Sequence, residues 1–372
     1  MNLKQLIAKT LANIYGWRTN KKFVVIESDD WGSIRMPSKK VYEKCLNAGY
    51  GIDLNFYERY DALESEDDLE ALFALLKQHT DQKGNYPVFT ANCLVANPDF
   101  DKINASHFSE YFYESVVDTF QKYPKHKHSF DLWMHGNEQG IFHPQYHGRE
   151  HLNVSLFMEA LQNGNKDVLF GFENKMPGCI KKQQQRSGNF YVEATMFRSK
   201  KDKEQKLAYY VEGLDLFETL IGYKSASIIP PNYTWSNDFD AEVFKKGVAC
   251  FQGSAKMREP GINQPNRYHR HYTGERNSLG QTYLVRNCSF EPSLNPQINS
   301  VTDCLKEIQI SFALNKPAII CSHRVNYIGF IDESNRSKSL QSLDQLLSGI
   351  LEKWPDVEFI TSDALGNLIN AN

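Results

Sequence analysis

The sequence predicts an α/β fold in which helices surround a mostly parallel sheet or barrel. Short apolar, β-rich runs recur along the chain, and segments with helical spacing of apolar residues lie between them. Several runs are nearly continuous in apolar residues rather than alternating, which is typical of strands buried on both faces. Such strands need helices outside them, so the alternation of strands and helices favours a parallel α/β architecture.

Nine segments are expected to be strands, and each ends on polar or glycine residues. They are residues 23–32, 88–95, 130–136, 168–172, 225–233, 248–254, 282–287, 318–327 and 357–363. The polar endings matter because the carboxyl ends of parallel strands share one edge of the fold, where catalytic residues collect.

Helices are expected between these strands. Residues 65–68 (Ser-Glu-Asp-Asp) resemble a capping box, and four apolar residues over 69–76 then recur at helical spacing. Similar spacing predicts helices over 108–120, 207–220, 301–314 and 340–351. No Gly/Ser- or Pro-rich linker and no internal repeat divides the sequence. We therefore expect one domain over residues 1–372, with an irregular insertion near 253–296.

The composition of the chain excludes several classes of protein. Its 372 residues are 41% hydrophobic and 23% charged, which is a globular profile. The net charge of −3 disfavours nucleic acid as a partner. No run approaches 18 apolar residues and the first 22 residues lack a signal-peptide pattern, so we expect no membrane span and a cytoplasmic location.

The seven cysteines are odd in number and scattered, with no CxxC motif. This predicts neither a disulfide framework nor a cysteine zinc site, and it is consistent with a reducing cytoplasm. Cys93, Cys250 and Cys321 lie in apolar runs, where we expect them to pack as small hydrophobic residues.

Histidines are concentrated in one short part of the sequence. Six of the eleven lie within residues 126–151, where an even spread would place about one. HPQYH (143–147) and HGREH (147–151) each separate two imidazoles by four residues, which on one turn of helix would share a face. Two histidines and one carboxylate make an open zinc site. Histidine pairs also occur on exposed helices without a metal, so the spacing alone leaves both interpretations open.

A pair of aspartates follows the first predicted strand. Asp29 and Asp30 stand within Ser-Asp-Asp-Trp-Gly (28–32), directly after an apolar segment. One carboxylate could bind a metal while its neighbour acts as a base. The alternative is an Asx turn in which both side chains cap backbone amides.

Two other strand ends carry chemically useful residues. Ser-His-Arg (322–324) follows an apolar strand, so its histidine either points to the same edge or bonds a loop carbonyl. Pro-Pro-Asn-Tyr (230–233) is either an ordinary turn or one that offers backbone N–H groups and an aromatic wall to a substrate. The basic residues between 267 and 276 belong either to a solvated surface loop or to a lid over an anionic substrate.

The order of these elements resembles the polysaccharide deacetylase family, carbohydrate esterase family 4. The resemblance runs from about residue 23 to 363: an aspartate pair after a strand, an HxxxH after Glu-Gln-Gly (138–140), a proline-tyrosine turn and a late strand ending in histidine. Residues 360–363 (Ile-Thr-Ser-Asp) look like the closing strand of the family. The resemblance implies a distorted (β/α) barrel and hydrolysis of an acetyl group from a sugar amide or ester, and hence a carbohydrate substrate.

The resemblance also implies a role for each motif residue. Asp29 would be the general base and His323 the general acid. The ligands of a divalent metal, with zinc the expected ion, would be Asp30, His147 and His151. The residues expected to contact the substrate are Trp31, Asn232, Tyr233 and Arg324. Because Asp29 must be anionic while His323 holds a proton, activity should follow a bell-shaped pH profile.

The sequence departs from the family pattern in three places. Glu-Ser-Asp-Asp-Trp-Gly-Ser (27–33) stands where the family usually has Thr-Phe-Asp-Asp-Gly-Pro. Isoleucines at 228 and 229 stand where an arginine normally precedes the prolines, so Arg324 or Arg149 would have to serve Asp29. His143 remains an alternative to His151, although HGREH is favoured because an amphipathic segment follows it.

Two other classes of function remain open from the sequence. One is a non-catalytic carbohydrate-binding barrel that keeps a metal site. The other is a metal-dependent glycosidase or phosphoesterase, because a fold does not fix a reaction. The oligomeric state is open as well.

Overall fold

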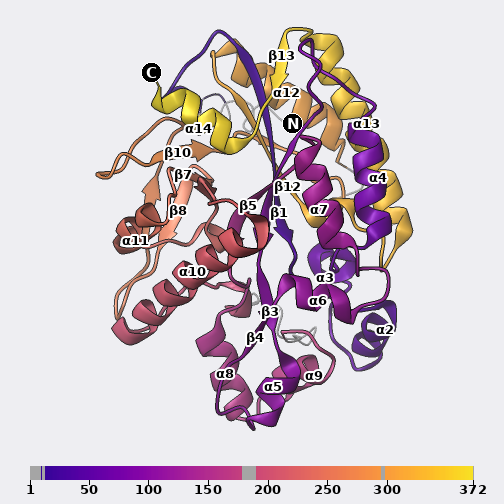
Figure 1. The fold of residues 1–372 in the computed structure, drawn as a ribbon, viewed down its shortest axis with the longest axis vertical. Coiled ribbons are helices and arrows are strands. Elements are labelled where there is room, and N and C mark those ends of the chain that lie inside the picture. The colour runs from indigo at the N-terminus through magenta and orange to yellow at the C-terminus, as the bar shows by residue number, and fades with distance from the viewer. Residues whose placement is uncertain (1–9, 11–12, 178–189, 295–297, 372) are drawn as a thin grey trace.

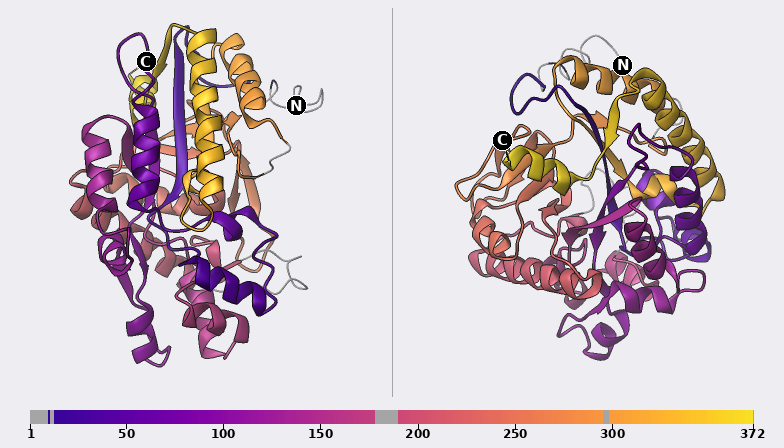
Figure 2. Two further views of the ribbon diagram at one scale, coloured as in Figure 1. Left: turned by 90° about the vertical axis from the view of Figure 1, so that its right-hand side faces the viewer. Right: turned by 45° about the horizontal axis from the view of Figure 1, so that its top comes forward.

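The computed structural model describes residues 10, 13–177, 190–294 and 298–371, and its centre is a parallel sheet. Nine strands form this sheet in the order β10-β7-β6-β5-β2-β1-β12-β11, and β13 pairs with the start of β1. All of these pairings are parallel. The sheet curls and helices cover its outside (Figures 1 and 2). The predicted distorted (β/α) barrel is confirmed.

The central strands are buried along nearly their whole length, as the continuous apolar runs predicted. The strands of the main sheet are β1 (Lys22–Trp31), β2 (Phe89–Leu94), β5 (Phe142–Gly148), β6 (Ser227–Ile228), β7 (Cys250–Gly253), β10 (Thr282–Val285), β11 (Cys288–Ser289), β12 (Ala318–His323) and β13 (Val357–Phe359). Two small antiparallel pairs lie apart from it: β3 (Ala96–Pro98) with β4 (Tyr113–Ser115), and β8 (Lys256–Glu259) with β9 (Arg267–Arg270).

The helices fill the connections between these strands. They are α2 (Lys39–Asn47), α3 (Phe56–Tyr60), α4 (Glu66–Leu76), α5 (Phe100–Ala105), α6 (Val116–Lys122), α7 (Ser129–Glu138), α8 (Val154–Gln162), α9 (Lys166–Glu173), α10 (Lys200–Ile221), α11 (Asp240–Lys245), α12 (Ser300–Ala313), α13 (Glu333–Lys353) and α14 (Ser362–Asn370). The capping box predicted at the start of α4 is present, with both hydrogen bonds between Ser65 and Asp68. Helices α4, α7 and α13 lie along one side of the sheet in Figure 1, and α10 lies along the other.

Three secondary-structure predictions were wrong. Residues 130–136 and 168–172, expected as strands, lie in α7 and α9. Both segments are short and apolar, and such runs cannot be assigned to helix or strand by periodicity alone. In α7, Trp133 is fully buried against Phe142 of β5, so tertiary packing decides the outcome. Of residues 108–120, expected as one helix, only the end from Val116 is helical, and β4 precedes it.

The stretch predicted as an irregular insertion is largely ordered. Its described part, up to residue 294, contains the β8–β9 hairpin, and it contributes β10 and β11 to the main sheet. Residues 295–296 lie outside the described residues. Arg267 and Arg270 on the hairpin are exposed and do not line the main cavity, so the structure places them on a solvated surface.

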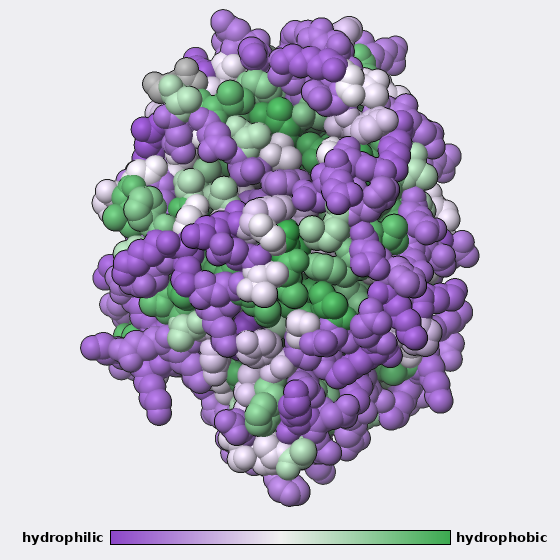
Figure 3. Space-filling model, viewed as in Figure 1, coloured by the Kyte–Doolittle hydropathy of each residue, from purple (hydrophilic) through white to green (hydrophobic). Residues whose placement is uncertain are grey.

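The polarity of the surface and the burial of two of the three cysteines agree with the sequence-based expectations. Hydrophilic residues dominate the face drawn in Figure 3, with smaller apolar patches between them. Among the described helices, none combines the length and apolar character that a bilayer span requires. Cys93 and Cys250 are buried in the sheet as expected, whereas Cys321 is only partly buried. Cys179 lies outside the described residues.

Candidate functional site

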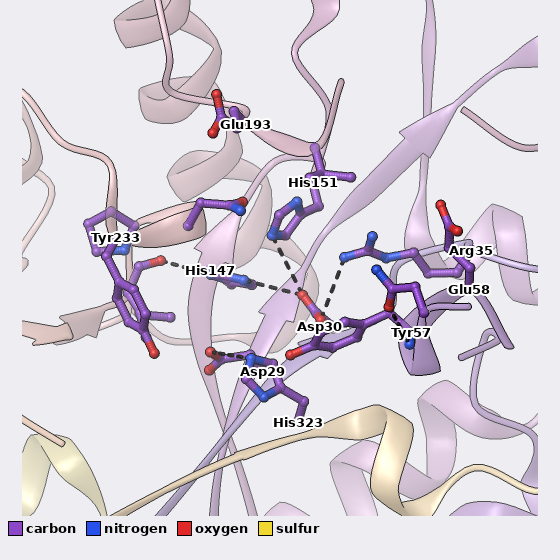
Figure 4. A pocket seen from close by; sticks show the side chains of 15 residues that line it. Asp29, Asp30, Arg35, Tyr57, Glu58, His147, His151, Glu193, Tyr233 and His323 are labelled. Atoms are coloured by element: carbon purple, nitrogen blue, oxygen red, sulfur yellow. Dashed lines mark hydrogen bonds and ion pairs between the residues drawn. The ribbon is translucent and has the colours of Figure 1, made fainter. Parts of the chain in front are cut away.

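A cavity of about 570 Å³ opens at the carboxyl ends of the central strands (Figure 4). Polar and aromatic side chains dominate its wall. The lining residues are Asp29, Asp30, Arg35, Asn55, Tyr57, Glu58, His147, His151, Val192, Glu193, Ile229, Pro230, Asn232, Tyr233 and His323. The structure thus brings together all five residues expected to act as base, acid or metal ligand, and two of the four expected to bind substrate.

A bulge in β1 turns both aspartates toward this cavity. Successive side chains on a regular strand point to opposite faces, so neighbouring residues cannot both reach one cavity without an irregularity. The pairing of β1 with β2 shifts register between Ser28 and Trp31, and Asp30 adopts a φ of +76°. This left-handed conformation is costly for a residue with a side chain and is typical of functional sites. The bulge therefore presents Asp29 and Asp30 together.

Asp29 is held by an arginine that the sequence analysis did not consider. Arg286 donates to both oxygens of Asp29 at 2.6 and 2.7 Å and to Glu27 at 2.5 Å. Asn92 donates to Asp29 Oδ1 at 2.8 Å. Burial favours the neutral acid, but the charge and hydrogen bonds of Arg286 outweigh it and lower the pKa of Asp29 to about 2. Asp29 is therefore an ionised carboxylate.

The two arginines expected as partners of Asp29 lie elsewhere. Arg149 makes a bidentate ion pair with Glu150 at 2.6 and 2.7 Å and a further one with Glu212. Arg286 follows β10 directly, at the end of the strand predicted over 282–287. The signal that located the other site residues, a polar group at a strand end, would also have found Arg286.

Asp30, His147 and His151 converge at the centre of the site. Asp30 Oδ1 lies 3.5 Å from His147 Nε2 and 3.7 Å from His151 Nε2. All three offer one ligand atom within 4.8 Å of the others. Their position matches the expected metal ligands, and Arg35 lies 3.6 Å from the other oxygen of Asp30.

The chemistry of these three residues suits a divalent metal. His147 Nδ1 donates to the carbonyl of Ile229 at 2.8 Å, which leaves Nε2 as the nitrogen that faces Asp30. Burial lowers the pKa of His151 to about 3, so its imidazole is neutral, the form that binds metals. His151 Nδ1 is buried without a hydrogen-bond partner among the described residues. Two neutral imidazoles and one carboxylate are the donor set of an open zinc-type site.

The histidine pair reaches this position by a different route from the one expected. His147 stands near the end of β5 and His151 in the loop before α8, so they do not share a helical turn. Their rings nevertheless lie 5.1 Å apart. His143, the alternative ligand, stacks on Tyr223 and lies 3.3 Å from Asp363. The HGREH motif, not HPQYH, therefore supplies both histidines of the cavity.

His323 is coupled to Glu291, another residue missed from the sequence. His323 Nδ1 lies 2.5 Å from Glu291 Oε1, and Nε2 lies 3.6 Å from Asp29. Burial opposes the charged imidazolium, but the charge and hydrogen bond of Glu291 raise the pKa of His323 well above its usual value. In the parallel pair β11–β12, Ser289 lies opposite Cys321. Two residues further along each chain, Glu291 therefore lies beside His323. His323 is thus a protonated imidazolium, and its Nε2 faces the ionised carboxylate of Asp29.

The Pro-Pro-Asn-Tyr turn forms one wall of the cavity. Asn232 and Tyr233 both have positive φ values, 54° and 51°, and the Tyr233 hydroxyl lies 3.2 Å from Arg286. The Tyr233 N–H donates to the carbonyl of Pro230, so it is not free to bind a substrate oxygen. The N–H of Asn232 has no acceptor among the described residues, which makes it the donor that this turn offers. Tyr57 lies edge-on to His323 at 5.3 Å.

Two residues expected to bind substrate do not line the cavity. Trp31 is 1% exposed and packs between Phe142 and Tyr327 in the core. Arg324 is fully buried and bonds to Asp61 and Glu64. Trp31 is the last residue of β1, after the bulge, and its side chain points into the core. Arg324 begins the short 3-10 helix that follows β12, which turns its side chain away from the cavity.

Two carboxylates of the cavity gave no signal in the sequence. Glu193 pairs with Arg258 at 2.6 Å. Glu58, in the short helix α3, makes no hydrogen bond or ion pair with any described residue, and burial raises its pKa. Neither residue follows a strand of the sheet, which is why the sequence pattern did not point to them.

No protein-family model matches the chain, and no curated protein matches its sequence significantly. Solved structures with a similar fold include Puue allantoinase (10% identity, covering 96% of this chain and 93% of that chain, TM-score 0.47) and the carbohydrate deacetylase Agd3 (9%, 98% and 57%, TM-score 0.44). They also include the 4-alpha-glucanotransferase from Thermococcus litoralis (8%, 93% and 40%, TM-score 0.44). The chain therefore spans less than half of the length of that glucanotransferase.

Proposed function

We propose that the protein is a metal-dependent hydrolase that removes an acetyl group from an N- or O-acetylated sugar or polysaccharide precursor. The observation that carries the proposal is that one cavity contains three kinds of group: an ionised carboxylate, a protonated histidine and three side chains that could hold a metal. Hydrolysis of an acetyl group is catalysed by a base that activates water, an acid that protonates the leaving group and a Lewis acid that polarises the carbonyl. The choice of an acetylated sugar rests on the resemblance of the motifs to the polysaccharide deacetylases.

Asp30, His147 and His151 would hold the metal, with zinc as the expected ion. When bound, a divalent metal there would polarise the acetyl carbonyl and make a water molecule acidic. Arg35 lies 3.6 Å from Asp30 Oδ2, whereas the two histidines face Oδ1, so Arg35 would orient this carboxylate through its other oxygen (Figure 4).

Asp29 would take the proton of the attacking water. Its position is fixed by Arg286 and Asn92, which donate three hydrogen bonds to its two oxygens. The charge and hydrogen bonds of Arg286 lower the pKa of Asp29 to about 2, so the carboxylate is ionised at neutral pH. Because a low pKa also means a low proton affinity, Asp29 can serve only an acidified water molecule, which agrees with its place beside the triad.

His323 would donate a proton to the departing nitrogen or oxygen. Glu291 holds one ring nitrogen, so the other faces Asp29 and the cavity. The N–H of Asn232, a residue of the cavity wall, would stabilise the developing oxyanion, a contribution of about 3 kcal/mol for a single donor. Water attacks the carbonyl carbon, the bond to the sugar nitrogen or oxygen breaks, and acetate and the free amine or alcohol leave.

Metal content and acetate release test the proposal together. Elemental analysis of protein purified without a histidine tag should find a tightly bound transition metal in the wild type and none in Asp30→Ala or His151→Ala. His143→Ala is the matched control, because His143 belongs to the other HxxxH and lies outside the cavity. Acetate release from acetylated sugars should follow the metal across these four proteins.

A wild type that contains no metal and does not bind added zinc would overturn the proposal. Bound metal without acetate release from any N- or O-acetylated sugar would contradict the proposed activity and favour a binding protein. Reducing ends released without acetate would favour a glycosidase.

A further inference from the structure

A second group of metal-ligating side chains lies beside the first. Glu291, Cys321 and His323 offer a carboxylate oxygen, a thiol sulfur and an imidazole nitrogen within 4.8 Å of one another. Glu291 Oε1 lies 2.5 Å from His323 Nδ1 and 4.0 Å from Cys321 Sγ. None of the three belongs to the triad proposed to hold the catalytic metal.

The sheet itself builds this second group. Cys321 and His323 are two residues apart on β12, so their side chains point to the same face. Parallel pairing of β11 with β12 then carries Glu291 to that face. Two of the three ligands, Cys321 and His323, are thus fixed on a strand, and Glu291 lies in the loop directly after β11, two residues beyond its last paired residue.

We propose that Glu291, Cys321 and His323 form a second zinc site, weaker than the first, that fills when zinc is in excess. One sulfur, one nitrogen and one oxygen are ligands that zinc accepts. Tetrahedral zinc with these bond lengths places its ligand atoms about 3.3 to 3.7 Å apart. The separations of 2.5 and 4.0 Å bracket that range, so small side-chain rotations complete the site.

Existing contacts make the second site weaker than the first. Glu291 already accepts hydrogen bonds from His323 and from Asn326, at 2.5 and 2.6 Å. Arg286 lies 3.3 Å from Cys321 Sγ and repels a cation. Zinc must displace the proton on His323 Nδ1 and the thiol proton of Cys321, and both protons go to solvent. By contrast, the nitrogens of His147 and His151 that face Asp30 are not engaged by Glu291 or by Arg286.

Occupation of this site would regulate the proposed activity, and this part of the inference rests on the proposed function. With zinc on Nδ1, the imidazole of His323 keeps only its Nε2 proton, and a neutral, zinc-bound imidazole is a much weaker acid than the imidazolium that the leaving group requires. Excess zinc should therefore inhibit hydrolysis.

Cadmium and zinc titrations test the site directly. Protein that already holds one metal equivalent is titrated with Cd²⁺, and the cadmium–thiolate charge-transfer band is followed in the ultraviolet. The same titration with Zn²⁺ is followed by calorimetry. The wild type should take a second equivalent at least tenfold more weakly than the first, with a thiolate band for Cd²⁺.

Variants then assign the ligands. Cys321→Ser should abolish the band and weaken the second Zn²⁺ equivalent more than tenfold, and Glu291→Gln should weaken it without abolishing the band. Cys250→Ser is the matched control, since Cys250 is a buried cysteine in β7 of the same sheet, and it should keep both equivalents. No second equivalent in the wild type, or a band that persists in Cys321→Ser, would overturn the second site.

The two proposals can fail separately. Asp30→Ala should lose the tight metal and keep the thiolate band, because Asp30 is not a ligand of the second site. A second equivalent in a protein without acetate release would support the second site and contradict the proposed function. Zinc inhibition that persists in both Cys321→Ser and Glu291→Gln would overturn the regulatory part of the inference.

Discussion

Two buried arginines, Arg286 and Arg324, show how the same ion-pair chemistry serves different purposes in one fold. Each follows a strand of the main sheet and each binds two carboxylates. One of the two partners of Arg286, Asp29, lines the cavity, whereas both partners of Arg324, Asp61 and Glu64, are fully enclosed. The two ion pairs use the same chemistry, so we expect exposure to the cavity, and not the ion pair itself, to distinguish the proposed base from a structural carboxylate.

One side chain lies between the Arg324 ion pairs and the cavity. Arg35 lies 3.6 Å from Asp30 and 3.7 Å from Asp61, which is a partner of Arg324. The structural cluster therefore sits directly behind the candidate metal site. Substitutions at Asp29 and at Arg324 test this distinction when both the activity and the free energy of unfolding of each variant are measured.

The largest expected effect is on the activity of Asp29→Asn. Loss of the carboxylate removes the proposed base, so the rate of acetate release should fall by about 10²- to 10⁴-fold. Metal content should stay at the wild-type level, because Asp29 is not in the triad. A variant that retains more than a tenth of the wild-type rate would show that Asp29 is not the base.

Removal of the enclosed arginine should instead lower stability. Arg324→Met leaves Asp61 and Glu64 buried without their partner, and breaking such a pair costs about 3 to 5 kcal/mol. Urea unfolding followed by circular dichroism measures this loss. Arg198→Met is the control: it removes an ion pair with Glu159 in which both side chains are about half exposed, and it should cost less than about 1 kcal/mol. Equal losses in the two variants would refute the distinction between enclosed and accessible pairs.

The pH profile of the activity should depend on Glu291. In the wild type, Glu291 raises the pKa of His323, so the proton needed from His323 is retained as the pH rises and is lost only above that raised value. Glu291→Gln removes the negative charge and lowers the pKa of His323. The alkaline decline of kcat/KM should therefore begin at lower pH, by about one unit or more. An unchanged alkaline limb would mean that His323 is not the acid.

The smallest effect is expected at the cavity wall. Glu58 has no hydrogen-bond or ion-pair partner among the described residues, which leaves its carboxyl group available to substrate hydroxyls. Glu58→Gln preserves its shape, so KM should rise by about two- to tenfold with little change in kcat, which corresponds to one ordinary hydrogen bond. Steady-state kinetics with an acetylated sugar measure this change, and a fall in kcat without a change in KM would contradict it.

Much of the fold and the centre of the site could be predicted from the sequence. Strand ends are informative because parallel strands deliver their last residues to one edge, and this rule located Asp29, Asp30 and His323. The rule did not distinguish side chains that point into the cavity from side chains that point into the core. Trp31 and Arg324 were expected in the cavity because they lie beside the site residues in sequence. The bulge in β1 leaves Trp31 in the core, and the 3-10 helix after β12 leaves Arg324 buried outside the cavity.

The rest required tertiary structure. The HPQYH segment has few of the residues that mark a strand, so its place in β5 follows from its position between β2 and β6. Arg286 and Glu291 come from the stretch expected to be irregular, and their partners Asp29 and His323 are distant in sequence. The strand end at residue 285 could have pointed to Arg286, but its pairing with Asp29, and that of Glu291 with His323, leave no trace in local periodicity.

The parallel register between β1 and β12 sets Asp29 opposite His323, and this has a consequence for how the protein is made. All three proposed metal ligands are present once a growing chain reaches residue 151, whereas the acid arrives only with β12. Pairing of segments so far apart in the sequence is slow, because the entropy of closing a long loop must be overcome first. During synthesis the residues proposed to hold the metal are therefore made before the proposed acid, and the two groups meet only when β12 pairs with β1.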